Sequence, residues 1–201
     1  MSNQYWLQPT RLEGETVSLL PLQPEHAEAL LHAASDGKLW QLWYTSVPNQ
    51  DNIDNYITQA LADQQAGLAL PFVVVHNATK QIIGTTRFCH ADSQQHRVEI
   101  GFTWYAKSFH KTKVNTECKY LLLRHAFEQL AAIAVELRTH WHNHTSRAAI
   151  ARLGAKQDGV LRNHQKNNDG SYRDTVVFSI IDSEWLIVKK SLHFKLQQAY
   201  R

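Results

Sequence analysis

Apolar and polar residues alternate along several short segments of the chain, and this period of two predicts β-strands. In residues 97–105, one face of the predicted strand carries Val98, Ile100, Phe102 and Trp104. The other face carries Glu99, Gly101, Thr103 and Tyr105. Further strands are predicted over residues 15–21, 70–76, 82–90, 133–140, 155–165 and 173–181. Short turns join 70–76, 82–90 and 97–105, so these are expected to be consecutive antiparallel strands.

Apolar residues at helical spacing predict helices between the strands. The first covers residues 24–37 and the second 51–67, with proline or glycine at their boundaries. A third begins at about Asn115, and its wide apolar arc indicates heavy burial. A short helix covers 143–154, and another is expected in the tail, which is rich in Lys and Gln. The strand–helix–strand order over residues 97–140 implies a parallel pair with a right-handed crossover.

A polar, basic loop at residues 107–113 separates the strand at 97–105 from the helix that follows. The first N–H groups of a helix lack intrahelical partners, and the helix dipole places partial positive charge there. Lys111 and Lys113 add two full charges at the same point. This arrangement predicts a site for a pyrophosphate group. The alternative is a solvated basic loop that binds nothing.

Composition limits the class of protein without selecting a function. The chain has 201 residues, a hydrophobic content of 43% and a net charge of +3, which fits one globular domain over residues 1–201. No linker, repeat, secretory signal or membrane-spanning run is visible. Cys89 and Cys118 have no metal-type spacing, so buried thiols in a cytoplasmic protein are expected. The small charge does not by itself indicate nucleic acid; a binder that used the basic loop and the Trp and Tyr residues is a rival interpretation.

Four segments carry a resemblance to a known family. They are L-x-G-x-x-V-x-L-x-P-L from Leu12, V-E-I-G-F-T-W from Val98, V-N-T-E-C-K-Y-L-L-L-R-H-A-F from Val114 and N-H-T-S-R-A-A-I-A-R-L-G-A from Asn143. A final hairpin, N-D-G-S-Y-R-D-T-V-V-F-S-I-I, follows them. In this order they resemble the GCN5-related N-acetyltransferases (GNAT), and more closely the branch that includes the RimJ/RimL enzymes.

The resemblance implies an α/β (α+β) GNAT fold, with a mixed, mostly antiparallel sheet of about seven strands flanked by about four helices. It covers about residues 12–185 and leaves 186–201 as a C-terminal tail. It also implies an N-acetyltransferase that uses acetyl-CoA as co-substrate. The acceptor would be a primary amine, on a protein N-terminus, a lysine or a small molecule, that attacks directly in a ternary complex. No nucleic-acid or membrane partner is expected, and monomer and homodimer both stay open.

The basic loop departs from the family pattern, which usually reads Arg/Gln-x-x-Gly-x-Gly/Ala. His110 stands in the Arg/Gln place, and Lys113 and Asn115 stand in the two glycine places. Glycine allows a close approach of backbone to phosphate and a positive φ, which lysine tolerates poorly. The charges of Lys111 and Lys113 offset this change. The departure motivates an alternative function, a catalytically inactive acyl-CoA-binding protein of the same fold.

Glu99 is the candidate general base. A carboxylate on a central strand beside Gly101 is costly to bury unless it is used or paired. The alternative is a structural ion pair with Arg87 or Arg97. The resemblance implies that Ser146 is the catalytic residue near the CoA sulfur, and an ordinary first-turn helix serine is the alternative.

The resemblance also implies a set of residues that bind acetyl-CoA: Phe102, Trp104, His110, Lys111, Thr112, Lys113, Val114, Asn115, Thr116, Asn143 and Ser146. Asn143 is expected at the pantetheine arm, with a simple helix N-cap as the alternative. His140 and His142 would share a strand face, which suits a metal, but no Cys or carboxylate completes the set, so no metal is assigned. The first two helices and residues 40–44 are expected to shape the acceptor pocket.

Overall fold

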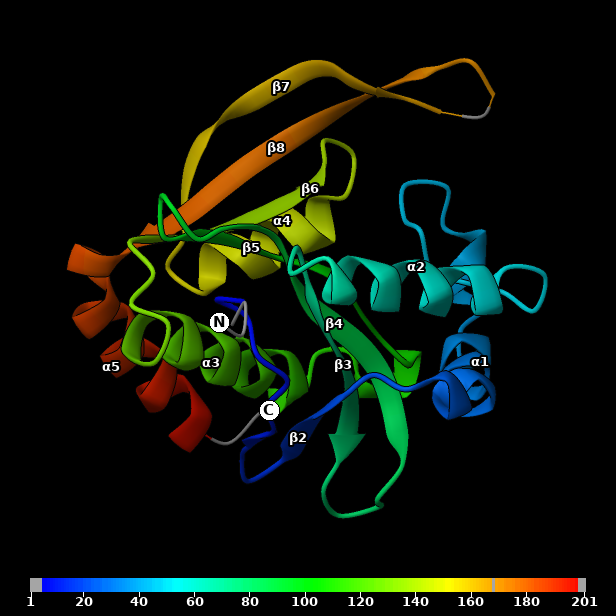
Figure 1. The fold of residues 1–201 in the computed structure, drawn as a ribbon, viewed down its shortest axis with the longest axis horizontal. Helices are drawn as coiled ribbons and strands as arrows, with labels where there is room; N and C mark the ends of the chain where they lie inside the picture. The colour runs from blue at the N-terminus through cyan, green and yellow to red at the C-terminus, as the bar shows by residue number, and fades with distance from the viewer. Residues whose placement is uncertain (1–4, 168, 199–201) are drawn as a thin grey trace.

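The described residues form an eight-stranded sheet in the order β1-β2-β3-β4-β5-β6-β8-β7 (Figure 1). The structure, a computed structural model, describes residues 5–167 and 169–198. The strands are β1 (Leu12–Glu13), β2 (Val17–Pro21), β3 (Leu70–His76), β4 (Ile82–Asp92), β5 (Arg97–Tyr105), β6 (Ala134–His140), β7 (Lys156–Lys166) and β8 (Tyr172–Ile181). All neighbouring strands are antiparallel except β5 and β6, which are parallel. The predicted mixed, mostly antiparallel sheet is confirmed.

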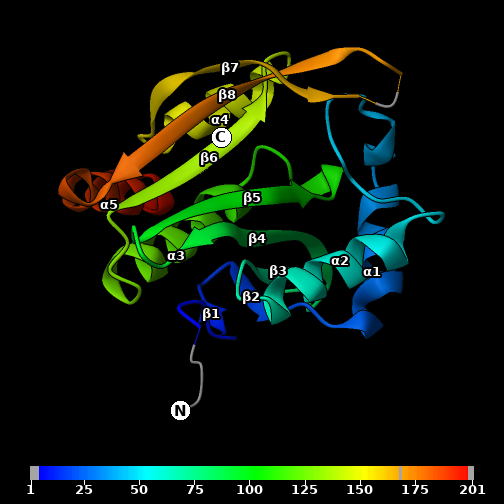
Figure 2. The same cartoon turned by 45° about the horizontal axis from the view of Figure 1, so that its top comes forward.

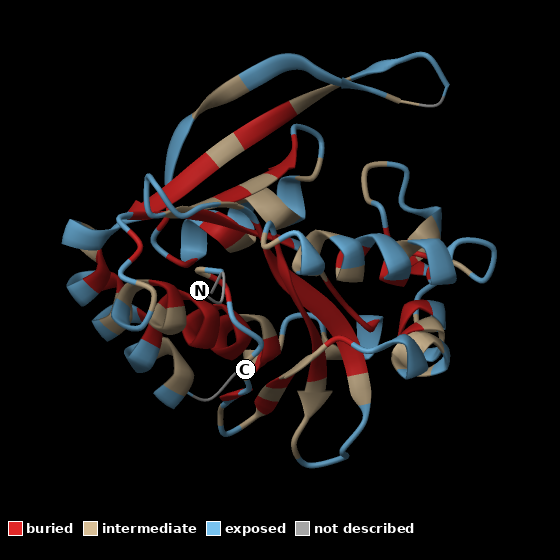
Figure 3. Cartoon of the chain, viewed as in Figure 1, coloured by how far each residue is buried: buried red, intermediate tan, exposed pale blue. Residues whose placement is uncertain are grey.

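In the described part of the chain, five α-helices cover the sheet: α1 (Ala27–Ser35), α2 (Ile53–Gln65), α3 (Lys113–Glu128), α4 (His144–Arg152) and α5 (Asp182–Gln197). Short 3-10 turns are η1 (Pro24–His26), η2 (Leu39–Gln41) and η3 (Lys107–Phe109). The buried hydrophobic residues form two cores on opposite faces of the sheet (Figures 1 and 2). One core includes residues of α3, α4 and α5, and the other includes residues of α1 and α2. Burial concentrates in the central strands and α3 (Figure 3). None of these helices is long and apolar enough to cross a membrane.

The predicted elements agree closely with the observed ones, and residues 70–76 and 97–105 form β3 and β5 with the predicted bounds. The eight strands and five α-helices of the described residues each exceed by one the number that the resemblance implies, although the fifth helix was expected in the tail. The two-residue strand β1 is too short to give a sequence pattern. Helix α5 begins at Asp182, so the expected start of a tail after residue 185 falls inside it. Trp185 is buried in this helix, and its Nε1 donates to Glu128 Oε1 on α3 at 2.9 Å.

The alternation along β5 breaks at Phe102, whose backbone φ is 51°. The pairing register with β4 shifts between Gly101 and Trp104, which is the signature of a β-bulge. Beyond the bulge the faces exchange, so Trp104 packs in the core of α1 and α2 while Tyr105 packs in the core of α3. The prediction that Phe102 and Trp104 continue the face of Val98 is therefore wrong, because a period of two assumes unbroken pairing.

A buried carboxylate joins α3 to the turn between β1 and β2. Glu117 accepts backbone N–H bonds from Glu15 at 2.9 Å, and from Thr16 and Val17 at 2.7 Å each. A Cβ atom at Gly14 would lie 2.7 Å from the carboxyl carbon of Glu117, so a side chain there requires a shift. The segment L-x-G-x-x-V near the start of the chain therefore has a glycine at position 14 because this residue packs closely against Glu117 of α3.

Candidate active site

Strands β5 and β6 pair only near their first residues and then diverge. Their parallel pairing covers Arg97 to Glu99 on β5. Beyond Glu99, β5 continues to Tyr105 and β6 to His140 without pairing to each other. Figure 2 shows the two ribbons separating along their length. A strand edge without a sheet partner offers N–H and C=O groups to a ligand, and this opening begins at Glu99.

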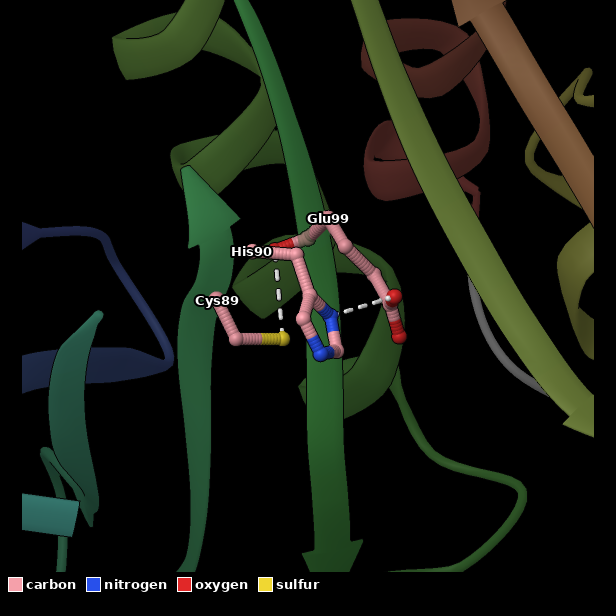
Figure 4. Close-up of side chains that lie close together, drawn as sticks. All are labelled: Cys89, His90 and Glu99. Carbon is pink, nitrogen blue, oxygen red and sulfur yellow. Dashed lines mark hydrogen bonds and ion pairs between the residues drawn. The ribbon is translucent and has the colours of Figure 1, made fainter. Parts of the chain in front are cut away.

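Glu99 is 8% exposed and is paired through its Oε2 atom. His90 Nδ1 lies 2.9 Å and Arg138 Nε 3.3 Å from this oxygen (Figure 4 for His90). The predicted partners Arg87 and Arg97 are wrong, because the strand register places other cations against this carboxylate. The hydrogen bond to Glu99 raises the pKa of His90, and the side chain of His90 is 67% exposed. The imidazole thus connects a buried carboxylate to solvent.

A second carboxylate, Glu136, extends this network on β6. Arg138 Nη2 lies 2.7 Å from Glu136 Oε2, and Arg97 Nη2 lies 2.8 Å from Glu136 Oε1. Burial opposes ionisation of Glu136, but the hydrogen bonds from Arg97 and Arg138 together hold its pKa below the ordinary value. Glu99 and Glu136 are register partners on adjacent strands. Arg138 therefore compensates two neighbouring negative charges that would otherwise repel each other.

Cys89, His90 and Glu99 present three potential metal ligands within 4.8 Å of one another (Figure 4). Burial raises the pKa of the Cys89 thiol, whose Sγ donates toward the backbone oxygen of Glu99 at 3.7 Å. A metal would need the thiolate, and it would need the Glu99 oxygen that Arg138 already contacts. We therefore assign neither a metal nor a nucleophile to this cluster.

A pocket of about 590 Å³ opens on the α1–α2 face of the sheet, beside the bulge. Arg87, Phe102 and Tyr56 form part of its wall. Trp40 contributes from the aromatic loop of residues 40–44, which is expected to shape the acceptor pocket. Arg87 is 2% exposed. Its guanidinium carbon lies 3.9 Å from the ring centroid of Phe102 and 5.0 Å from that of Tyr56. The side chain of Phe102 is thus turned toward this pocket.

Trp43, from the same aromatic loop, packs on two histidines at the end of β6. Its ring centroid is 5.0 Å from that of His140 and 5.7 Å from that of His142. The predicted shared strand face of these histidines is wrong, because β6 ends at His140. His140 Nδ1 accepts the backbone N–H of His142 at 3.0 Å. Burial, followed by the charge of Arg173, lowers the pKa of His140. Because Nδ1 accepts the bond from His142, a neutral ring carries its proton on Nε2.

The basic loop leads into α3, which begins at Lys113 with Thr112 as N-cap. Thr112 Oγ1 accepts the N–H of Val114 at 3.3 Å. Positive φ falls on Lys111, at 60°, whereas Lys113 and Asn115 are helical. The conflict expected from a lysine in a left-handed glycine place therefore does not arise at Lys113. The strain lies instead at Lys111, where this conformation costs about 1–2 kcal/mol.

Two other loop contacts define what the predicted residues can offer a ligand. His110 Nε2 donates to the backbone oxygen of Tyr105 at 2.8 Å and so ties the loop to the end of β5. Val114 and Thr116 are each 1% exposed, and Thr116 Oγ1 accepts from Arg152 Nη2 at 3.3 Å. These two buried residues can therefore present backbone groups to a ligand rather than side chains.

Helix α4 begins at His144, shortly after β6 ends at His140. Asn143 caps it, since Asn143 Oδ1 accepts the N–H of Ser146 at 3.0 Å. The capping alternative for Asn143 is therefore realised, and its Nδ2 group has no hydrogen-bond partner in the described part of the chain. Ser146 is half-buried, and its Oγ forms no hydrogen bond with the residues that the structure describes.

Sequence reasoning missed three charged residues of this site. Arg138 stands two positions after Glu136, so the two residues share a strand face. The predicted parallel pairing with the strand of Glu99 could therefore have indicated that Arg138 lies near Glu99. His90 was placed at the end of a predicted strand, but its approach to Glu99 depends on the turn to β5. Arg87 was considered only as an ion-pair partner, and its burial between two rings has no sequence signature.

The chain is similar to known proteins over most of its length. It is 26% identical over 176 residues to the uncharacterized N-acetyltransferase YoaA of Bacillus subtilis (strain 168), covering 85% of this chain and 96% of that protein. A solved acetyltransferase chain from T. thermophilus is 32% identical with a TM-score of 0.82, covering 95% of this chain and 99% of that one. Mycobacterium smegmatis RimJ, solved in complex with CoA-disulfide, has the same fold with a TM-score of 0.79, 19% identity and coverages of 93% and 95%.

The family model described as acetyltransferase (GNAT) domain matches residues 16–156, which is more than half of the chain. The chain therefore belongs to the GNAT family of acetyltransferases, of the RimJ/RimL type, and the resemblance seen in the sequence is confirmed. Its class is that of the acetyl-CoA-dependent N-acetyltransferases.

Proposed function

We propose that this protein transfers the acetyl group of acetyl-CoA to a primary amine by direct attack within a ternary complex. The observation that carries the proposal is the divergence of β5 and β6 beyond Glu99. The unpaired carboxyl end of β5 leads to a helix N-terminus with two lysines, Lys111 and Lys113. A free strand edge suits an extended chain with amide groups, and a helix N-terminus suits a pyrophosphate.

The residues that would hold acetyl-CoA divide into two groups. The pyrophosphate would bind the N–H groups of the loop and first turn and the two lysine ammonium groups, over residues 110–116. The pantetheine would run along β5 and contact the backbone of Phe102 and Trp104, because both side chains point to the α1–α2 side. The RimJ structure of the same fold was solved in complex with CoA-disulfide, which supports a CoA ligand for this fold.

Glu99 acts as the general base in this proposal. A protonated amine has no lone pair, so its proton must leave before the nitrogen attacks the thioester. Glu99 lies where the strands part, Arg138 Nε lies 3.3 Å from its Oε2 atom, and His90 links it to solvent. The proton would pass from the amine to Glu99 and onward to His90. His140 is less suited, because its Nδ1 already accepts the N–H of His142.

The leaving sulfur needs a proton or a hydrogen bond. As the C–N bond forms, the carbonyl oxygen becomes an oxyanion and the nitrogen becomes cationic. The C–S bond then breaks to give CoA thiolate, and the proton that the nitrogen loses passes to this sulfur, which leaves a neutral amide and CoA thiol. Ser146 has an uncommitted hydroxyl at the start of α4 and would donate to this thiolate, while Asn143 Nδ2 would bind the pantetheine arm. No acyl-enzyme is invoked, because burial raises the pKa of both thiols, Cys89 and Cys118.

Thermal unfolding with and without acetyl-CoA tests this proposal. Ligand at 100 times Kd stabilises the folded state by about 2.7 kcal/mol, which raises the midpoint of a chain of this size by about 5–11 °C. An amine screen that follows free CoA thiol then measures turnover. A rise in midpoint without turnover on any amine would favour the catalytically inactive acyl-CoA-binding protein. No rise at millimolar acetyl-CoA would contradict the proposal.

The variants Lys111→Ala and Lys113→Ala are each expected to weaken acetyl-CoA binding by about 3- to 10-fold, the net contribution of one ordinary hydrogen bond. The loss should shrink at high salt, because ions screen exposed charges. Titration calorimetry at two salt concentrations measures it. Lys166→Ala is the matched control, since Lys166 is an exposed lysine on β7. An equal loss in that control would show that net charge, and not the loop, governs binding.

A further inference from the structure

We propose that the pocket beside the bulge binds an anionic group of the acceptor through Arg87, so that the acceptor is a small amine that also carries a carboxylate. The inference rests on the proposed function, because it names the substrate class for the site at Glu99. It adds a charge requirement on the acceptor that membership of the family does not imply.

Among the described residues, Arg87 is a buried cation that forms no ion pair. It is 2% exposed, its Nε has no hydrogen-bond partner, and no carboxylate within residues 5–167 and 169–198 forms an ion pair with it. Burying a guanidinium is costly unless it is paired. The rings of Phe102 and Tyr56 lie against the guanidinium but cannot accept all its in-plane N–H bonds. Those planar donors match the two oxygens of a carboxylate.

The rest of the pocket suits a small polar molecule. Its volume of about 590 Å³ lies in the range of small-molecule sites. The wall carries the side-chain amides of Asn49, Asn52, Asn55 and Gln59. Asp63 is the acidic residue of this wall, and its Oδ1 accepts from Gln59 Nε2 at 2.8 Å. Arg87 is therefore the group in this wall that can meet a negative charge.

The strand register places Arg87 within reach of the candidate base. Arg87 pairs with Gly101, and Cys89 pairs with Glu99, so Arg87 and Glu99 are diagonal neighbours on one face of β4 and β5. Such diagonal positions are about 7–8 Å apart. A Cβ atom at Gly101 would approach Glu99 Oε1 to 3.1 Å and Cys89 Sγ to 3.0 Å. The glycine thus leaves room for the Glu99 carboxylate beside the residue that pairs with Arg87. The inference places the amine of one small molecule at Glu99 and its carboxylate at Arg87.

Rates on matched amine pairs test the inference. The probes are L-alanine against L-alaninamide, L-leucine against L-leucinamide, and ethanolamine phosphate against ethanolamine. In the wild type we expect kcat/KM to favour the acid over the amide by about tenfold or more, the worth of a charged hydrogen-bonded pair. In Arg87→Gln the preference should fall to about twofold or less, and Arg87→Lys, which keeps the charge without the planar fork, should lie between them. The midpoint shift with acetyl-CoA should be unchanged in both variants.

Binding of the products separates this inference from the proposed function. In calorimetry, N-acetyl-L-alanine should bind the wild type about tenfold more tightly than N-acetyl-L-alaninamide, because only the acid can form a charged pair with Arg87. This binding measurement does not require turnover. Equal affinities, or no binding of either, would overturn the inference, while acetylation of plain amines would leave the proposed function standing. A preference for ethanolamine phosphate alone would overturn the carboxylate assignment. The wild-type comparison decides the matter even where Arg87→Gln fails to fold.

Discussion

The variant Glu99→Gln is expected to lower kcat by about 10²- to 10⁴-fold, which is the usual worth of a positioned general base. An amide cannot accept the amine proton, although it has the size of the carboxylate and can still hydrogen-bond to Arg138. The midpoint shift with acetyl-CoA should be retained, because Glu99 lies apart from the basic loop. Steady-state rates at saturating acetyl-CoA, with the best amine of the screen, measure the effect.

Glu136→Gln is the matched control for this change. Glu136 is the register partner of Glu99 and contacts the same arginine, Arg138, so the variant removes an equal charge from the same network. Its kcat should stay within about tenfold of the wild type, since no proton transfer is assigned to it. Wild-type turnover by Glu99→Gln would reduce Glu99 to a structural partner of Arg138.

An NMR titration of His90 checks the geometry without relying on catalysis. The hydrogen bond to the Glu99 carboxylate is the largest cause of the raised pKa of His90, since it favours the imidazolium form. In Glu99→Gln this pKa should fall toward its ordinary value, and in Glu136→Gln it should fall much less. An unchanged pKa of His90 in Glu99→Gln would mean that the pair does not form in solution.

The variant Glu117→Ala is expected to lower the free energy of unfolding by about 2–5 kcal/mol, because three backbone N–H groups would lose a charged acceptor in a buried place. These groups belong to Glu15, Thr16 and Val17. An unsatisfied buried donor costs about 1–3 kcal/mol, and local relaxation recovers part of the sum. Urea unfolding followed by circular dichroism measures the change.

Glu13→Ala is the control for that loss of charge. Glu13 belongs to the same end of the chain, but its pair with Arg11 is exposed, with side-chain exposures of 67% for Glu13 and 64% for Arg11. Exposed pairs of this kind contribute about 0–1 kcal/mol. A loss in Glu117→Ala no larger than that in Glu13→Ala would show that the contact between α3 and the β1–β2 turn contributes little to stability.

Periodicity in the sequence predicted the elements well where local pairing is regular. The bounds of β3 and β5 follow from runs of β-branched and aromatic residues between turns, and the parallel pairing of β5 with β6 follows from the intervening helix. The prediction failed at Phe102, because a bulge depends on the partner strand as much as on the strand itself. It was also uninformative on β1, whose two residues pair only because β2 is beside them.

The glycine places of the basic loop show a similar division. The sequence showed that Lys113 and Asn115 replace the glycines of the family pattern, and it predicted conformational difficulty there. The structure places the left-handed residue at Lys111 and starts α3 at Lys113. The reason is that the point at which a helix begins is set by its cap, here Thr112, and by the strand that delivers the chain to it.

By itself, the sequence determined the family, the order of strands and helices, the basic loop ahead of α3 and the presence of a carboxylate on a central strand. These features depend on neighbours within a few residues, or on motifs that can be recognised in the sequence alone. Only the tertiary structure decided that Glu99 meets His90 and Arg138, that Glu117 binds the β1–β2 turn, and that Arg87 faces a pocket without a counter-ion among the described residues. Such contacts join residues that are distant in the chain. The register of the sheet determines which of these residues meet, and sequence patterns do not fix that register to within a residue or two.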